Sequence, residues 1–227
     1  MIELRNVCKT FVLKGRRQVV ADNINAVFPD RRAVAILGRN GAGKTSLLKM
    51  LAGTMHPDSG EVLSTGHISW PVGFAGSFHP ELSGLQNTRF IARVYGVDTD
   101  ELADFVADFA ELGQHFHLPI RSYSSGMKSR LAFGVSMGIK FDTYLVDEVT
   151  AVGDATFKKK SEALFAQRMA DSSAVMVTHT MGQVRRLCNY VGVLHEGRLH
   201  FYEDVEEGIA FHEELMARGR EAAGRPR

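Results

Sequence analysis

Two kinds of hydrophobic pattern alternate along this chain. Short, uninterrupted apolar runs are typical of strands buried on both faces of a parallel sheet, and they occur at residues 33–37, 144–146, 174–177 and 191–194. Between them lie longer segments with apolar residues at helical spacing. In residues 100–112 this stripe consists of Leu102, Phe105, Val106, Phe109 and Leu112. Strands that alternate with helices predict an α/β fold.

Other segments depart from this alternation. Residues 1–11 and 18–28 indicate two strands around a basic turn, and residues 61–70 indicate one or two short strands. The stretch from 85 to 138 is mostly helical and is interpreted as an insertion, with Ser83 as the cap of its first helix. The remaining expected elements are helices at 44–52 and 157–170 and a final hairpin that turns at Gly197.

Size and composition favour one ordinary globular domain. The chain has 227 residues, close to the limit for a single core. It has 27 basic and 26 acidic side chains, and a net charge of +1 gives no reason to expect a nucleic acid or an anionic lipid as a partner. We expect one domain over residues 1–217 and a disordered Gly-, Pro- and Arg-rich tail at 218–227.

The cysteines and histidines give no sign of a disulfide framework or a metal centre. Cys8 and Cys188 lack metal-ligand spacing, which favours a reducing cytosol. His115 and His117 lack a third ligand and are assigned to a surface loop. No apolar stretch approaches the roughly 20 residues of a membrane helix, so a partner must hold the protein if it works at a membrane.

A phosphate-binding motif follows the first apolar run. The segment GRNGAGKT at 38–45 fits the P-loop pattern in full and lies between a predicted strand and a predicted helix. Its backbone N–H groups predict an anion site for the phosphates of ATP, with Lys44 reaching the β- and γ-phosphates and the Thr45 hydroxyl suited to Mg²⁺. The predicted nucleotide contacts are Gly38, Asn40, Gly41, Ala42, Gly43, Lys44, Thr45 and Ser46.

Two acidic residues end the apolar run at 144–146. In a chain with a P-loop, Asp147 is placed to hold Mg²⁺, and Glu148 to orient and deprotonate the attacking water. His179 follows the run at 174–177 and is placed to hydrogen-bond the γ-phosphate or that water. These residues predict ATP hydrolysis.

A second anion site is predicted at residues 123–131. The segment YSSGMKSRL resembles the signature motif of ABC-transporter ATPases, with Ser124, Ser125 and Gly126 at a helix start. The resemblance implies a P-loop NTPase core of the ABC type, with an N-terminal antiparallel β subdomain and a helical subdomain at about 85–138. In that family the signature completes the ATP site of the opposite subunit, so it also implies a head-to-tail homodimer with two sandwiched ATP molecules.

The same resemblance assigns further residues. Residues 150–154 take the position of the D-loop, with Asp154 at its end, and His179 takes the position of the switch histidine. Phe11 takes the position of the aromatic residue that stacks on adenine, although a core aromatic is an equal alternative. The family usually has a Gln between the two motifs that touches Mg²⁺, whereas residues 73–77 offer none and Gln86 lies within a predicted helix.

One subgroup of the family matches more finely. Residues 69–74, 79–84 and 147–154 are similar to the ATP-binding subunits of Gram-negative capsular-polysaccharide exporters, relatives of the O-antigen exporters. This implies a membrane-spanning permease, a peripheral location at the cytoplasmic face of the inner membrane, and export of lipid-linked polysaccharide. O-antigen relatives often carry a C-terminal carbohydrate-binding domain that this chain has no room for, so we expect the capsule branch.

Residues 70–81 are interpreted as the groove for a cytoplasmic helix of the permease, because Trp70, Phe74 and Phe78 form an aromatic cluster. The alternative is that these aromatic residues are buried. Other open interpretations are an O-antigen, teichoic-acid or importer ATPase, or a soluble ABC ATPase acting on DNA or ribosomes. The gap from Thr45 to Ser124 is too short for the long coiled coil of the DNA-repair members, and the single cassette disfavours the translation members.

Overall fold

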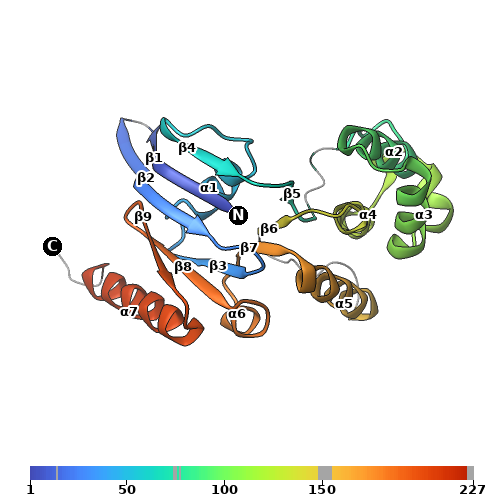
Figure 1. The fold of residues 1–227 in the computed structure, drawn as a ribbon. Helices are drawn as coiled ribbons and strands as arrows, with labels where there is room; N and C mark the ends of the chain where they lie inside the picture. Colours follow the sequence, from blue (N-terminus) through green and yellow to red (C-terminus); the bar gives the residue numbers. More distant parts are fainter. Residues whose placement is uncertain (14, 74–75, 77, 148–154, 224–227) are drawn as a thin grey trace. The chain divides into compact units, whose positions relative to one another are not determined.

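The computed structural model describes residues 1–13, 15–73, 76, 78–147 and 155–223 (Figure 1). These residues belong to two compact units. The first unit comprises Met1–Ile68, Asp142–Glu148 and Ser172–Arg227, and the second comprises Ser69–Phe141 and Val149–Asp171. The second unit thus contains all of the predicted helical insertion at 85–138 and one further helix.

Three strands of the first unit form a small antiparallel sheet in the order β2-β1-β4. They are β1 (Ile2–Leu13), β2 (Arg16–Phe28) and β4 (Ser59–Ser64). The hairpin of β1 and β2 confirms the two strands predicted from the sequence, and its register places Phe11 opposite Gln18.

The larger sheet has the strand order β5-β6-β7-β3-β8-β9. Its strands β3, β6, β7 and β8 run parallel, and β9 returns antiparallel to β8. Each parallel strand is largely buried, as its continuous apolar run predicts. The bounds are β3 (Ala33–Leu37), β5 (Ile68–Pro71), β6 (Thr143–Asp147), β7 (Ser173–Val177), β8 (Tyr190–His195) and β9 (Arg198–Tyr202).

Helix α1 (Lys44–Leu51) shares one core with both sheets of the first unit. Leu47, Leu48, Met50 and Leu51 of α1 are buried in the same cluster as Leu4 of β1 and residues of the parallel strands. This core holds the start of α1 against the carboxyl end of β3.

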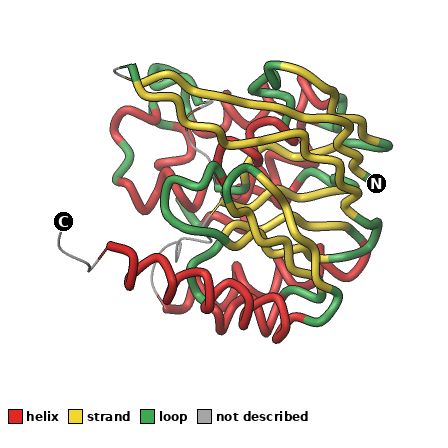
Figure 2. Tube along the Cα trace, turned by 90° about the vertical axis from the view of Figure 1, so that its left-hand side faces the viewer, coloured by secondary structure: helices red, strands yellow, loops and turns green. Residues whose placement is uncertain are grey.

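Helices α6 (Met181–Leu187) and α7 (Val205–Ala223) complete the first unit. Figure 2 shows α7 packed beside the strands of the larger sheet, and Ile209 of α7 is buried there. The sequence did not predict α7, and the helix continues to Ala223. The helix thus extends through residues 218–223 of the tail that was expected to be disordered, while 224–227 lie outside the described residues.

The second unit is helical. It contains α2 (Gly84–Tyr95), α3 (Thr99–Ala110), α4 (Ser125–Gly138) and α5 (Ala155–Asp171), with short 3₁₀ turns at Gly113–His117 and Ile120–Ser122. Stacked and edge-on phenylalanine rings from α3, α4 and α5 form much of its core. The helical stripe predicted at 100–112 supplies buried Leu102, Val106, Phe109 and Leu112. Within the described ranges, no helix is long and apolar enough to cross a membrane.

Candidate nucleotide-binding site

The predicted P-loop connects β3 to α1 in the first unit. Gly38 has φ 153°, and a Cβ there would lie 2.5 Å from the carbonyl oxygen of Leu194. Gly43 has φ 104°, and its Cβ would lie 2.6 Å from Cβ of Val20. Any side chain at either position collides with a neighbouring strand, so the tight loop requires glycine at both ends.

The start of α1 is a positive site. Lys44 is only 7% exposed, and its Nζ donates hydrogen bonds to the carbonyl oxygens of Gly38 at 2.8 Å and Arg39 at 3.0 Å. Among the described residues no side chain caps the first turn of α1, and that turn contains no acidic residue. Backbone N–H groups, the helix dipole and an ammonium group therefore converge on one loop, which fits a polyphosphate.

Strand β2 braces this loop through Gln18. Its Nε2 donates a 2.6 Å hydrogen bond to the carbonyl oxygen of Gly41. Because Gln18 pairs with Phe11 across the hairpin, one contact joins the phosphate loop to the strand pair that carries the predicted adenine-stacking residue. Phe11 is partly exposed, with Lys9 Nζ 5.7 Å from its ring centre. No sequence pattern marked Gln18, because the contact depends on the hairpin register.

The parallel sheet brings two other predicted residues to the same edge. Asp147 ends β6, where it pairs with Val177, the last residue of β7, and β7 lies beside β3. His179 follows two residues after the end of β7. The turn between β7 and His179 is fixed by Thr178. Its hydroxyl donates a hydrogen bond to Gln183 Oε1 at 2.9 Å and accepts one from the N–H of Thr180 at 3.1 Å. Glu148 and Asp154 lie outside the described residues.

A histidine that the sequence analysis missed lies near this edge. His212 of α7 is half-buried, and burial is the main cause that lowers its pKa from the ordinary value. The positive charge of Lys44 lowers that pKa further, and His179 acts in the same direction, whereas Glu213 raises it. No motif marked His212, because α7 itself was not predicted.

The predicted signature residues lie in the second unit. Ser124 is the N-cap of α4, and its hydroxyl accepts a hydrogen bond from the N–H of Met127 at 3.2 Å. Ser125 and Gly126 are the first residues of the helix. The start of α4 is therefore an exposed helix N-terminus, a feature that can bind anions.

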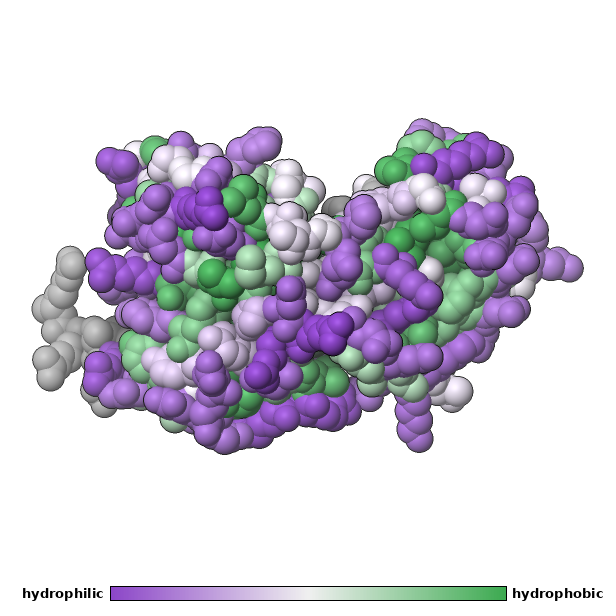
Figure 3. All heavy atoms as spheres, in the orientation of Figure 1, coloured by the Kyte–Doolittle hydropathy of each residue, from purple (hydrophilic) through white to green (hydrophobic). Residues whose placement is uncertain are grey.

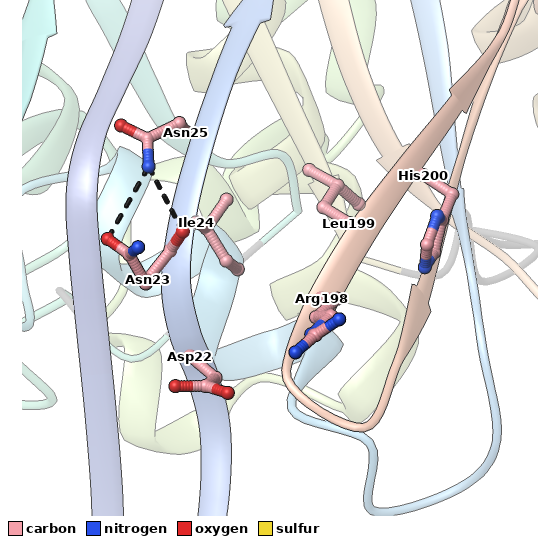
Figure 4. Close-up of a pocket in the computed structure, with 7 residues that line it drawn as sticks. All are labelled: Asp22, Asn23, Ile24, Asn25, Arg198, Leu199 and His200. Atoms are coloured by element: carbon pink, nitrogen blue, oxygen red, sulfur yellow. Dashed lines mark hydrogen bonds between the residues drawn. The ribbon is translucent and has the colours of Figure 1, made fainter.

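A cavity lies apart from the predicted nucleotide contacts. A cavity of about 450 Å³ is lined by residues 22–25 of β2 and 198–200 of β9 (Figure 4). None of the predicted nucleotide contacts is among its lining residues.

Within the part of the chain that the structure describes, no group of three or more His, Cys, Asp or Glu side chains is placed to hold a metal, and both cysteines are free. His115 and His117 are exposed, which agrees with their assignment to a surface turn.

Comparison with known proteins decides the family. The family described as ABC transporter matches residues 21–151 of this chain. This chain belongs to the ABC transporter family. The P-loop lies inside the matched region, and so do the signature residues. The resemblance predicted from the sequence is therefore confirmed.

The relatives of this ABC ATP-binding protein are named as ATP-binding proteins, and some of the names also refer to transport or export. It is 45% identical over 212 residues to the polysialic acid transport ATP-binding protein KpsT of Escherichia coli, covering 92% of this chain and 95% of the relative. It is 39% identical to the ATP-binding protein BexA of Haemophilus influenzae, covering 95% and 100%. It is 34% identical to the O-antigen export system ATP-binding protein RfbB of Klebsiella pneumoniae, covering 91% and 85%.

Solved structures confirm the predicted fold. An ATP-binding subunit of an ABC transporter matches this ABC ATP-binding protein with a TM-score of 0.76 at 18% identity, covering 96% of this chain and 98% of that one. A dimeric post-hydrolysis structure of the cassette MJ0796, bound to ADP and Pi, matches with a TM-score of 0.73 at 22% identity, covering 89% and 98%.

Proposed function

We propose that this chain is the ATP-hydrolysing subunit that powers export of a lipid-linked capsular polysaccharide across a bacterial inner membrane. The observation that carries the proposal is identity above 35% to KpsT and BexA, spread over more than nine-tenths of the chain. It is also 38% identical, over 95% of the chain, to the capsule polysaccharide export ATP-binding protein CtrD of Neisseria meningitidis. Identity is lower to the O-antigen relative, at 34%, which favours the capsule branch. The names of KpsT, CtrD and RfbB supply the transport class, and the site described above supplies the chemistry.

The P-loop holds the nucleotide. The α1 N-terminus and the buried Lys44 bind the β- and γ-phosphates, and Phe11 packs on the base. Thr45 and Asp147 are oxygen donors at the same sheet edge and are the residues that would hold Mg²⁺. Bound Mg²⁺ supplies positive charge to the phosphate oxygens.

Hydrolysis is assigned to the residues after β6 and β7. Glu148 orients the attacking water and accepts its proton, and His179 donates a hydrogen bond to the γ-phosphate. Ser124, Ser125 and Gly126 of a second copy close the site over the nucleotide, so two copies bind two ATP molecules. ATP favours this dimer because it contacts both half-sites, and hydrolysis releases it.

Coupling to a permease is assigned to the second unit, where the surface includes residues 79–81 of the predicted groove and extends to α2. Trp70 of the predicted groove packs against Tyr95 and Phe141 at ring distances of 4.9 and 5.5 Å, so it belongs to an aromatic cluster within the unit. Phe74 lies outside the described residues. Helix α2, however, exposes Phe90 by 57% and Val94 by 61%. Figure 3 shows hydrophobic surface among the hydrophilic residues of this unit, and such patches are typical of interaction sites.

A deletion experiment tests the function. Cells that lack this chain should lose surface polysaccharide while lipid-linked polymer accumulates inside, and the wild-type chain should restore export. A chain carrying Glu148→Gln should be made at normal levels, bind its permease in detergent and fail to restore export. Normal surface polysaccharide in the deletion strain would refute the assignment of substrate, and failure to co-purify with any membrane protein would refute the transport role.

A further inference from the structure

The loop from His79 to Ser83 in the second unit is held by one buried amide. Asn87 of α2 is 2% exposed, and its Oδ1 accepts a 2.8 Å hydrogen bond from the N–H of His79. Its Nδ2 lies 3.1 Å from the carbonyl oxygen of His79, 3.2 Å from that of Leu82 and 2.9 Å from that of Ser83. One side chain therefore forms hydrogen bonds with backbone groups at both ends of the loop. The loop and the first turn of α2 thus form one rigid body.

The N-terminus of α2 is tied to the same loop by its cap. Ser83 and Gln86 form a reciprocal capping box, with bonds of 3.1 Å from the Gln86 N–H to Ser83 Oγ and 2.9 Å from the Ser83 N–H to Gln86 Oε1. The Gln86 that the sequence placed in a helix therefore has a structural task at the N-terminus of α2. The cap fixes how the loop enters the helix.

The loop is also bonded to the segment that precedes the signature motif. The N–H of Ile120 donates to the carbonyl oxygen of Leu82 at 3.0 Å, and the N–H of Arg121 donates to that of Pro80 at 2.9 Å. The Arg121 guanidinium also lies 3.3 Å from the carboxylate of Glu81, with both side chains mostly exposed. Two backbone bonds thus connect residues 80–82 to residues 120–121, only three residues before Ser124.

Tyr123 continues the connection to the signature. Its hydroxyl donates a 2.6 Å hydrogen bond to the carbonyl oxygen of His115, and the ring is buried. A Cβ on Gly84 would lie 2.5 Å from that hydroxyl and 2.8 Å from the ring of Phe116. The start of α2 therefore abuts Tyr123 directly, and the next residue, Ser124, caps α4.

We propose that Asn87 is a positioning residue that transmits movement of the 79–83 loop to the signature residues Ser124–Gly126. The inference rests on the proposed function, in which a permease contacts the second unit. A permease that shifts the exposed His79–Glu81 edge displaces residues 120–121 through their backbone bonds. The N-terminus of α4 follows, and ATP closure of the dimer is promoted or prevented.

The test compares Asn87→Ala and Asn87→Asp with a matched control, Thr88→Val. Thr88 is the next residue of α2, is fully buried, and donates a 2.8 Å hydrogen bond to the carbonyl oxygen of Gly84 within the helix. The control thus removes a buried hydrogen bond without touching the loop. Asn87→Asp keeps the acceptor for the His79 N–H and the side-chain volume but loses the donors, so it serves if Asn87→Ala does not fold.

The assay uses the complex of this chain with its permease. The Asn87 variants should bind ATP within about twofold of wild type, because the P-loop lies in the other unit. Permease-stimulated ATPase activity and ATP-dependent dimerisation should fall about 3- to 30-fold, the range of couplings carried by one such link. Amide exchange at Ile120 and Arg121 should accelerate, while exchange within α3 should not change.

The outcomes separate the two hypotheses. If Asn87→Asp and Thr88→Val lower the melting temperature by the same amount and keep the same permease-stimulated ATPase activity, Asn87 contributes to stability alone and the inference is wrong. If the wild-type chain neither binds a permease nor shows stimulated activity, the proposed function fails. Loss of coupling in the Asn87 variants but not in Thr88→Val supports both.

Discussion

Replacing Gln18 by Ala tests whether the β1–β2 hairpin positions the phosphate loop. The substitution removes a neutral N–H···O bond of 2.6 Å to the Gly41 carbonyl at an exposed position. Such a bond contributes about 0.5–1.5 kcal/mol. If the whole of that energy holds the loop in its ATP-binding form, the dissociation constant of ATP should rise about 2- to 13-fold.

Titration calorimetry with ATP, ADP and inorganic tripolyphosphate is the assay. All three ligands use the phosphate loop, so their affinities should fall together if Gln18 positions Gly41. The affinities for ATP and ADP should fall further than the affinity for tripolyphosphate if the bond also fixes the hairpin that carries Phe11. Gln18→Glu should weaken binding more than Gln18→Ala, because a carboxylate cannot donate to a carbonyl and repels the phosphates.

Val19→Ala is the matched control for this prediction. Val19 is the neighbouring residue of β2 and is 46% exposed. Its truncation keeps the Gln18 bond and should leave all three affinities unchanged. Nucleotide affinities in Gln18→Ala equal to those of Val19→Ala would refute the idea that this bond holds the loop.

Three other predictions test separate parts of the molecule. Glu148→Gln should bind MgATP as tightly as wild type but hydrolyse it about 10²–10⁴-fold more slowly, measured as phosphate release, if Glu148 is the general base; wild-type turnover would remove it from that role. Gly84→Ala should lower the melting temperature and the ATPase activity, because its methyl group collides with Tyr123, whereas Gly96→Ala, which is strained by its φ of 67° but meets no neighbouring atom, should lower the melting temperature and leave the activity intact. Because the pKa of His212 is lowered below its ordinary 6.5, the unfolded chain binds the proton more readily, so wild type should lose stability relative to His212→Gln as pH falls through about 6.5; parallel pH–stability curves would contradict this.

The parallel strands were predictable because a strand buried on both faces consists of an uninterrupted apolar run. The run Ala33–Leu37 lies between Arg32 and Gly38, and the structure gives β3 those same bounds. The Ser83 cap was predictable for a similar local reason, since a capping residue satisfies N–H groups only two or three positions away. Both features depend on neighbours in the sequence.

Helix α7 was not predictable in this way. Gly208 lies in its interior, where glycine normally disfavours a helix. The structure shows the reason for glycine, since a Cβ would lie 2.7 Å from Cβ of Val191 on β8. Tertiary contact, rather than helix propensity, places this segment. His212 and Gln18 were missed for the same reason, because their partners are distant in the sequence.

Lys44 is a buried charge in the phosphate-binding loop. Its ammonium group is 7% exposed, and its Nζ donates hydrogen bonds to the carbonyl oxygens of Gly38 and Arg39. A phosphate bound at the start of α1 adds an opposite charge close to this ammonium. Lys44→Met keeps the aliphatic length without the charge, so the variant should lose the stabilisation that a bound nucleotide provides.

Nucleotide binding should stabilise the wild-type chain but not the variant. At ATP concentrations about 100 times the dissociation constant, binding stabilises wild type by about 2.7 kcal/mol, which corresponds to roughly 5–11 °C in melting temperature for a chain of this size. Lys44→Met should show little or no such shift, as measured by thermal melting with and without ATP. If Lys44→Met and wild type showed equal shifts in melting temperature with ATP, the role of Lys44 in binding the phosphates would be refuted.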